Sequence, residues 1–248
     1  MRIRRLSWAG VTIEAAGATL VIDPLEDAAG ALRLGMGPPR EALVPAGPDG
    51  SADGALVTHA HPDHFDPRAL RRLLGGGGAV FCPRGMERRV LDAGLAPRAM
   101  EAGASAQVGR ATVAAVESVD GFGDPQLAWV VEAEGRRVLH CGDTLWHGAW
   151  WRIARLHGPF DVAFLPVNAP LVEPPGLPPS GIPAAMSPEQ AAAAAALVGA
   201  RAVCPIHHGT FHCPPAYAET DHPLERLRAA AAARGVEVLA LAPGEWAP

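Results

Sequence analysis

Three histidines and one aspartate stand within seven residues, in the stretch 58–64, which reads Thr-His-Ala-His-Pro-Asp-His. Imidazole and carboxylate are ligands that borderline divalent cations prefer. The stretch directly follows a short apolar run, so a tight turn at a strand end would aim alternate side chains at different ions. We therefore expect His59 and His61 to face one metal ion, and Asp63 and His64 to face a second.

Further segments with metal-binding residue types follow the same order along the chain as in one known family. They read Ile22-Asp23-Pro24, Cys141-Gly142-Asp143-Thr144 and Cys204-Pro205-Ile206-His207-His208-Gly209-Thr210-Phe211. Together with His-x-His-x-Asp-His, they resemble the motifs of the metallo-β-lactamase-fold hydrolases. The last segment is similar to the Pro-x-His-x-Gly-Thr-Phe segment of the branch that includes ascorbate-phosphate lactonases and N-acyl-phosphatidylethanolamine phospholipases.

This resemblance implies a fold, a metal content and residue roles. The fold would be a four-layer αββα sandwich of the α/β (α+β) class, formed by residues 1–248 as one domain. The centre would hold two divalent metal ions, zinc in the first place, with manganese or iron as alternatives. By the resemblance, Asp143 bridges the two metals, His207 is the late ligand, and Asp23 lies just behind the ligands.

One position departs from the family's pattern. Where the family has another histidine ligand at a strand end, residues 116–122 read Val-Glu-Ser-Val-Asp-Gly-Phe. Placing the preceding strand against the pattern puts Asp120 in the histidine position, with Glu117 as the weaker substitute. A carboxylate makes the first site harder and more anionic, which shifts its preference from zinc towards manganese or iron. The alternative is that this site has lost a ligand and binds metal weakly or not at all.

A dinuclear centre predicts hydrolysis. Two adjacent divalent ions lower the pKa of a shared water enough to leave hydroxide at neutral pH, and they polarise the oxygen under attack. We expect the substrate to be a small molecule with an ester-type bond, a lactone or a phosphodiester, and Asp63 to orient the nucleophile. His147 and His212 are candidates for protonating the leaving group, and His208 for contacting the substrate.

Two other functions stay open. One is a mononuclear iron enzyme of the same fold that oxidises sulfur compounds, which the unusual Asp120 makes credible. The other is a non-catalytic metal-binding protein in which an occupied site only stiffens the fold. Fold resemblance alone does not decide between them, because this fold hosts many reactions.

Composition limits the class of protein further. The chain has 248 residues, of which 49% are hydrophobic, enough to bury a sizeable core. The net charge of −5 argues against a nucleic-acid partner. No run of apolar residues is long enough for a membrane span, and the N-terminus lacks the apolar stretch of a signal peptide. The four cysteines form no CxxC pair, so we expect reduced thiols and a cytoplasmic protein.

The hydrophobic pattern predicts strands followed by helices in both halves of the chain. Asp66 and Ser187 stand where they would cap helices, the latter with the capping-box partner Gln190. The expected strands are 11–14, 19–22, 55–58, 79–82, 112–116, 127–132, 137–141, 162–165, 201–204 and 236–241, and the expected helices are 67–74, 86–93, 146–156, one from 188 and 224–233.

Residues 168–185 are unusually rich in proline and look like an insertion at the mouth of the site. Proline stiffens such a segment, so it suits a lid, a contact in a homo-oligomer or a solvated connector. If the segment lines the pocket, its apolar side chains favour a partly apolar substrate; these are Leu171, Val172, Leu177 and Ile182.

Overall fold

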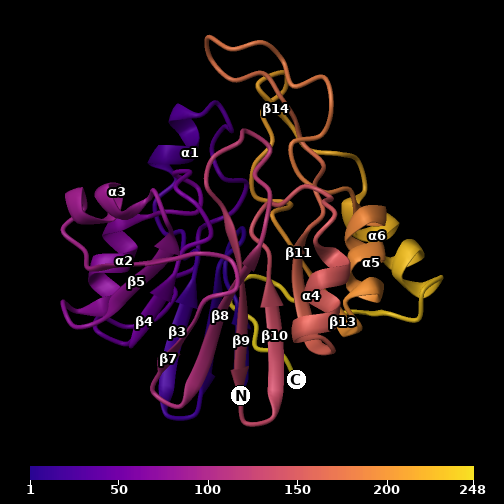
Figure 1. Ribbon diagram of the computed structural model, residues 1–248. Helices are drawn as coiled ribbons and strands as arrows, with labels where there is room; N and C mark the ends of the chain where they lie inside the picture. The colour runs from indigo at the N-terminus through magenta and orange to yellow at the C-terminus, as the bar shows by residue number, and fades with distance from the viewer.

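The computed structural model describes residues 1–248, and its first sheet comes from the N-terminal part of the chain (Figure 1). Its six strands lie in sequence order, antiparallel as far as β3 and parallel from there to β6. They are β1 (Arg2–Arg5), β2 (Val11–Ala15), β3 (Ala18–Ile22), β4 (Gly54–Leu56), β5 (Ala79–Pro83) and β6 (Pro97–Met100). The associated helices are α1 (Ala29–Arg33), α2 (Pro67–Leu74) and α3 (Glu87–Asp92).

The second sheet has seven strands in the order β15-β13-β11-β10-β9-β8-β7. These strands are β7 (Ser105–Val108), β8 (Ala111–Glu117), β9 (Leu127–Ala133), β10 (Arg136–His140), β11 (Phe160–Pro166), β13 (Ala200–Ile206) and β15 (Glu237–Val238). Its helices are α4 (Trp150–His157), α5 (Pro188–Leu197) and α6 (Pro223–Ala232). A small third sheet pairs β12 (Leu171–Val172) with β14 (Tyr217–Ala218).

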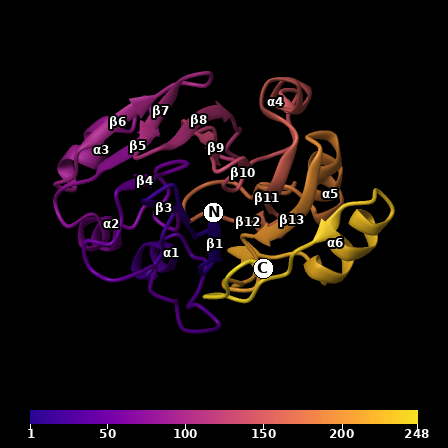
Figure 2. The same ribbon diagram turned by 90° about the horizontal axis from the view of Figure 1, so that it is seen from below.

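Three apolar layers hold the sandwich together. Between the two sheets lie large buried side chains that include Trp8, Trp129 and Phe164. A second layer packs the second sheet against α4, α5 and α6, and a third packs the first sheet against α2 and α3. Figure 2 shows α2 and α3 on one outer side and α4, α5 and α6 on the other. The predicted αββα sandwich is therefore confirmed.

The predicted capping residues explain where two helices begin. Oδ1 of Asp66 accepts the backbone N–H groups of Arg68 and Ala69, each at 3.0 Å. Ser187 and Gln190 form the predicted capping box at the start of α5. These bonds satisfy donors that the first helical turn leaves unpaired.

Other expectations about the elements were wrong. The helix expected from Trp146 begins only at Trp150, because the side chain of His147 accepts the backbone N–H of Ala149 and holds the preceding residues in a turn. Only Trp150 of the three neighbouring tryptophans is buried, and Trp151 is 61% exposed. The short strands β1, β6 and β7 were not expected, and the final strand is limited to two residues.

The topology brings several loops to one edge of the sandwich. In the first sheet β4 runs parallel to β3, and in the second sheet β8, β10, β11 and β13 all point the same way. The carboxyl ends of these strands meet at the upper edge in Figure 1. The proline-rich segment rises above this edge beside β14. None of the helices has both the length and the apolar character needed to cross a membrane.

Candidate metal centre

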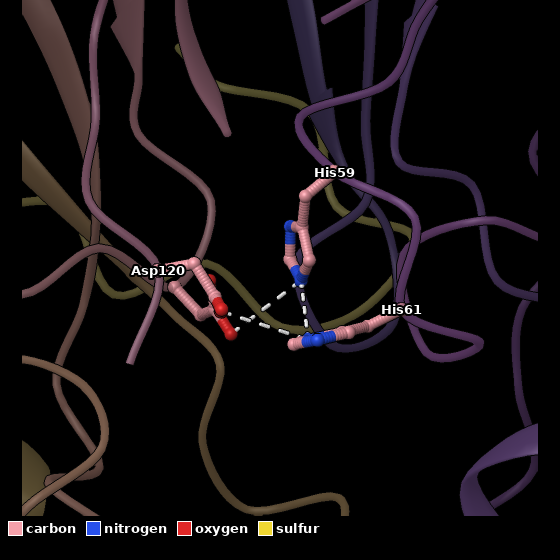
Figure 3. Close-up of side chains that lie close together, drawn as sticks. His59, His61 and Asp120 are labelled. Carbon is pink, nitrogen blue, oxygen red and sulfur yellow. Dashed lines mark hydrogen bonds and ion pairs between the residues drawn. The ribbon is translucent and has the colours of Figure 1, made fainter. Parts of the chain in front are cut away.

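Four side chains from three of these loops form a first group of candidate ligands. The ligand atoms of His59, His61, Asp120 and Asp143 lie within 4.8 Å of one another. Nε2 of His59 is 2.9 Å from Nδ1 of His61 and 3.6 Å from Oδ2 of Asp143. Figure 3 shows His59 and His61, from one loop, and Asp120, from another, pointing towards one another. Glu117, the weaker substitute, instead pairs with Arg152 on α4.

A second group lies next to the first. It consists of Asp63, His64 and His207, whose ligand atoms also lie within 4.8 Å of one another. Oδ2 of Asp63 is 3.5 Å from Nε2 of His64 and 3.6 Å from Nε2 of His207. Nε2 of His207 is also 3.9 Å from Oδ2 of Asp143, so Asp143 stands between the two groups. The structure thus brings together all seven side chains that the sequence singled out as ligands.

Several of these ligand atoms have no partner within the chain. Nε2 of His64, Nε2 of His207, Oδ1 of Asp120 and Oδ1 of Asp143 are buried and make no hydrogen bond. A buried polar atom left unpaired costs about 1–3 kcal/mol, so four in one cluster require a common explanation. A divalent cation held by nitrogen and oxygen donors provides one, and the donor set therefore fits metal ions.

Buried hydrogen bonds fix every member of the second group. Nδ1 of His64 lies 2.8 Å from Oδ2 of Asp23, whose carboxylate also accepts the backbone N–H of Thr58 at 2.8 Å. Nδ1 of His207 donates to Oδ1 of Asn168 at 3.0 Å. The indole of Trp8 donates to Oδ2 of Asp63 at 2.9 Å. Such partners fix the ring orientation and tautomer, and they leave Nε2 of each histidine free to face a metal.

The first group is held mainly by the loop that carries Asp120. Oδ2 of Asp120 accepts the backbone N–H groups of Phe122 and Asp124, at 2.8 and 2.9 Å, which leaves Oδ1 directed at the group. The Asp124 carboxylate lies 2.9 Å from Nε2 of His61 and so orients Nδ1 of that ring. Behind His59, the hydroxyl of Thr58 lies 3.0 Å from Nδ1.

Three of these supporting residues were not predicted from the sequence. Asp124 follows Asp120 by four residues in the same loop, a spacing that marks it as a second carboxylate of that loop. Trp8 and Asn168 carry no such signal. They reach the site because the two sheets pack together and because the proline-rich segment begins beside β13.

The protonation of the cluster follows from its burial and its carboxylates. Burial lowers the pKa of His59 well below its usual value and that of His207 to about 4, so both rings are neutral, as metal ligands must be. Burial raises the pKa of Asp143 to about 7, and the nearby Asp120 adds to the shift. Burial lowers the pKa of His64, but adjoining carboxylates, chiefly Asp63, outweigh it and raise the pKa to about 10. A divalent cation at Nε2 would compete with that proton.

Both groups open onto a cleft of about 440 Å³. Members of both groups line it, together with apolar side chains from the segment after α1, the Asp120 loop and the proline-rich segment. Val172 and Leu177 line the cleft as expected, whereas Leu171 and Ile182 do not, and Ile182 is 70% exposed. A larger hollow of about 640 Å³ lies at the other end of the second sheet and contains none of the candidate ligands.

The histidines proposed for proton transfer or substrate contact lie outside the cleft wall. The ring of His147 stacks on Trp150 with centroids 4.4 Å apart, and its Nδ1 is used by the turn before α4. Burial and the neighbouring Arg5 guanidinium lower the pKa of His208 to about 3. None of His147, His208 and His212 lines the cleft.

Comparison with known proteins assigns the family. The model of the Beta-lactamase superfamily domain matches residues 18–208. A UPF0173 metal-dependent hydrolase from Thermus thermophilus is 30% identical, over 99% of this chain and 97% of its own. The chain belongs to the beta-lactamase superfamily, among the UPF0173 metal-dependent hydrolases.

A second relative and a solved structure extend this finding. A UPF0173 metal-dependent hydrolase from Rubrobacter xylanophilus is 34% identical over 65% of this chain, and the match spans 66% of that relative, just under two thirds. The metallo hydrolase Igni18 from Ignicoccus hospitalis has the same fold, with a TM-score of 0.71 at 22% identity over 99% of this chain and 97% of its own. The predicted superfamily is confirmed, while the lactonase and phospholipase branch stays a prediction.

Proposed function

We propose that this UPF0173 family member uses two divalent metal ions to hydrolyse an ester-type bond of a small molecule, either a lactone or a phosphodiester. One observation carries the proposal: two groups of candidate ligands lie side by side, with Asp143 between them. Four of their buried donor and acceptor atoms have no other partner. A single isolated metal site would not require this shared carboxylate.

In this proposal each group holds one ion. His59, His61 and Asp120 would hold the first, Asp63, His64 and His207 would hold the second, and Asp143 would contribute to both. When bound, two such ions lower the pKa of a water between them and polarise the substrate oxygen. Because a carboxylate stands where the family has a histidine, we also propose that the first site accepts manganese or iron more readily than an all-histidine site would.

The protein's own groups would orient the reactants. Oδ2 of Asp63 is fixed by Trp8, so that carboxylate can hold a water molecule in one orientation. Tyr217, the only tyrosine of the chain, lines the cleft, and its hydroxyl accepts a hydrogen bond of 2.6 Å from Asn168. Its own proton is therefore free to be donated to a substrate oxygen.

The cleft favours a partly apolar substrate. Met36, Phe122, Val172 and Leu177 supply much of its wall, and burying such surfaces against a ligand yields about 25 cal/mol per Å². Arg89 is the only arginine that lines it. This surface suits a lactone or a diester with an apolar group better than a substrate that carries several phosphates.

The proposal is tested with chelator-treated protein that is reloaded separately with zinc, manganese or ferrous iron. Dihydrocoumarin serves as the lactone probe and bis(p-nitrophenyl) phosphate as the phosphodiester probe. We expect hydrolysis of at least one probe, loss of activity on chelation and recovery with metal. His147→Ala, outside the cleft, is the matched control and should keep the activity of the wild type. Absence of hydrolysis with every metal, together with oxygen consumption on a thiol or persulfide, would instead establish the oxidative alternative.

A further inference from the structure

One charged side chain in the cleft takes no part in the candidate metal centre. Arg89 is an exposed residue of α3 and lines the cleft together with Phe122 and Asp124. The Arg89 side chain forms no ion pair and no hydrogen bond with any other residue of the chain. The cleft's acidic side chains already have partners: Asp124 contacts His61, Asp63 accepts from Trp8, and Asp143 belongs to the ligand groups. The positive charge of Arg89 is therefore free to meet a ligand.

The surroundings of Arg89 restrict what that ligand can be. Beside the candidate ligands, much of the cleft wall is apolar, with Leu34, Met36, Val172 and Leu177 among its members. One guanidinium matches the charge and the planar fork of a single carboxylate, which it can bind through two parallel hydrogen bonds. A phosphate dianion would call for further positive groups, and no other arginine lines this cleft.

We propose that Arg89 binds a carboxylate of the substrate and so determines substrate specificity. The substrate class is then an amphiphilic ester: the scissile bond lies at the metal groups, an apolar body lies along the cleft, and a carboxylate pairs with Arg89. The inference rests on the proposed function, because it takes the cleft as the site of hydrolysis. It adds the chemical class of the substrate and the residue that selects it.

The neighbouring arginine provides a matched control. Arg88 lies on the same helix, but it pairs with Asp92 at 2.9 Å, its side chain is 86% exposed, and it does not line the cleft. Replacing either arginine by methionine removes one positive charge from α3 and keeps an unbranched side chain. Only Arg89→Met removes a charge from the cleft.

The test compares p-nitrophenyl hexanoate with the mono-p-nitrophenyl esters of succinate, adipate and suberate. The diacid esters carry a free carboxylate at increasing distance from the scissile bond. We expect the metal-loaded wild type to prefer the best of them over the neutral ester by about 5- to 10-fold in kcat/KM, as a partly exposed charged hydrogen-bonded pair would give. Arg89→Met should abolish this preference, Arg88→Met should keep it, and Arg89→Lys should retain part of it. A preference that persists in Arg89→Met, or its absence from a wild type that hydrolyses the neutral ester, would overturn the inference.

A binding measurement separates this inference from the proposed function. Titration calorimetry of adipate and hexanoate with the same metal-loaded proteins needs no turnover. Tighter binding of adipate that depends on Arg89, with no ester hydrolysed, would support the carboxylate site and contradict the hydrolase proposal. Hydrolysis of the neutral and charged esters at equal rates, with no Arg89-dependent binding, would overturn the carboxylate site and leave the hydrolase proposal standing.

Discussion

The two groups of candidate ligands differ in how firmly the protein holds them. Every member of the second group, Asp63, His64 and His207, is buried and has a buried hydrogen-bond partner. In the first group, His61 depends on Asp124, whose side chain is 55% exposed. Supporting bonds to buried partners hold ligands in place better than bonds that water can replace. We therefore expect the second group to keep its metal firmly and the first to exchange metal more readily.

The first group also depends on the proline-rich segment. Gly121, next to Asp120, packs so closely on the returning part of this segment that a Cβ at that position would overlap the carbonyl oxygen of Ala184. The backbone N–H of Met186 also donates to the carbonyl of Thr144, directly after Asp143. The returning part of the proline-rich segment thus supports the first group, whereas Asn168, where the segment begins, supports His207 in the second.

The largest effect is expected from His64→Ala. This change removes a ligand from the firmly held group and leaves the buried Asp23 carboxylate without its imidazole partner. We expect the loss of one metal ion per chain and a fall in kcat/KM of at least about 1000-fold, since a catalytic metal is worth several kcal/mol. Elemental analysis and steady-state kinetics measure both quantities. Retention of the wild-type metal content would contradict the assignment of the second group.

A second substitution, Asp120→His, should change which metal the first group prefers. It introduces the imidazole that the family usually has, so we expect the ratio of zinc to manganese affinity to rise by at least about 10-fold. The backbone N–H groups that Asp120 now satisfies would lose their acceptor, at a cost of about 1–3 kcal/mol in stability. Competition with a chromophoric chelator measures the affinities. An unchanged ratio would show that residue 120 is not a ligand.

The contrast between the groups can be measured at their supporting carboxylates. Asp23→Asn weakens the buried partner of His64 and should lower metal affinity by about 10- to 100-fold. Asp124→Asn makes the same isosteric change at an exposed partner of His61 and should lower affinity by less than about 10-fold. Competition with a chelator measures the metal affinity of both variants. Equal losses would remove the proposed difference between the groups.

The smallest effect is expected far from both groups, where Glu189 at the start of α5 pairs with Arg226 on α6. The hydrogen bonds from Arg226 lower the pKa of Glu189 from 4.5 to about 2. The pair therefore adds stability above pH 4.5, and this contribution disappears as the pH falls towards 2. Because both side chains are partly exposed, Glu189→Gln should cost no more than about 1 kcal/mol at pH 7, with metal content unchanged. Urea unfolding at pH 7 and pH 3 should show the difference shrinking at the lower pH.

The sequence predicted the parts of the centre that depend on local order along the chain. The candidate ligands lie in loops that follow strand ends, so the αββα topology is enough to bring them to one edge. This holds even for Asp120, which stands where the family has a histidine. The supporting contacts of Trp8 and Asn168 depend instead on how the sheets and the proline-rich segment pack, which local patterns do not encode. For the same reason the sequence did not reveal that His147 and His208 lie outside the cleft wall, because adjacency to a motif does not determine which way a side chain points.

The most direct test of the two-metal centre is the metal content of the purified chain beside Asp120→Asn and Glu117→Gln. Asparagine keeps the shape of residue 120, and its side-chain oxygen can still accept the N–H groups of the loop. Its NH₂ group then stands where Oδ1 of Asp120 faced the metal site. Glu117→Gln is the matched change at a carboxylate that pairs with Arg152 outside both groups. We predict two metal ions per chain in the wild type and in Glu117→Gln, and a fall towards one in Asp120→Asn. One ion or fewer in the wild type, or two in Asp120→Asn, would contradict the proposed centre.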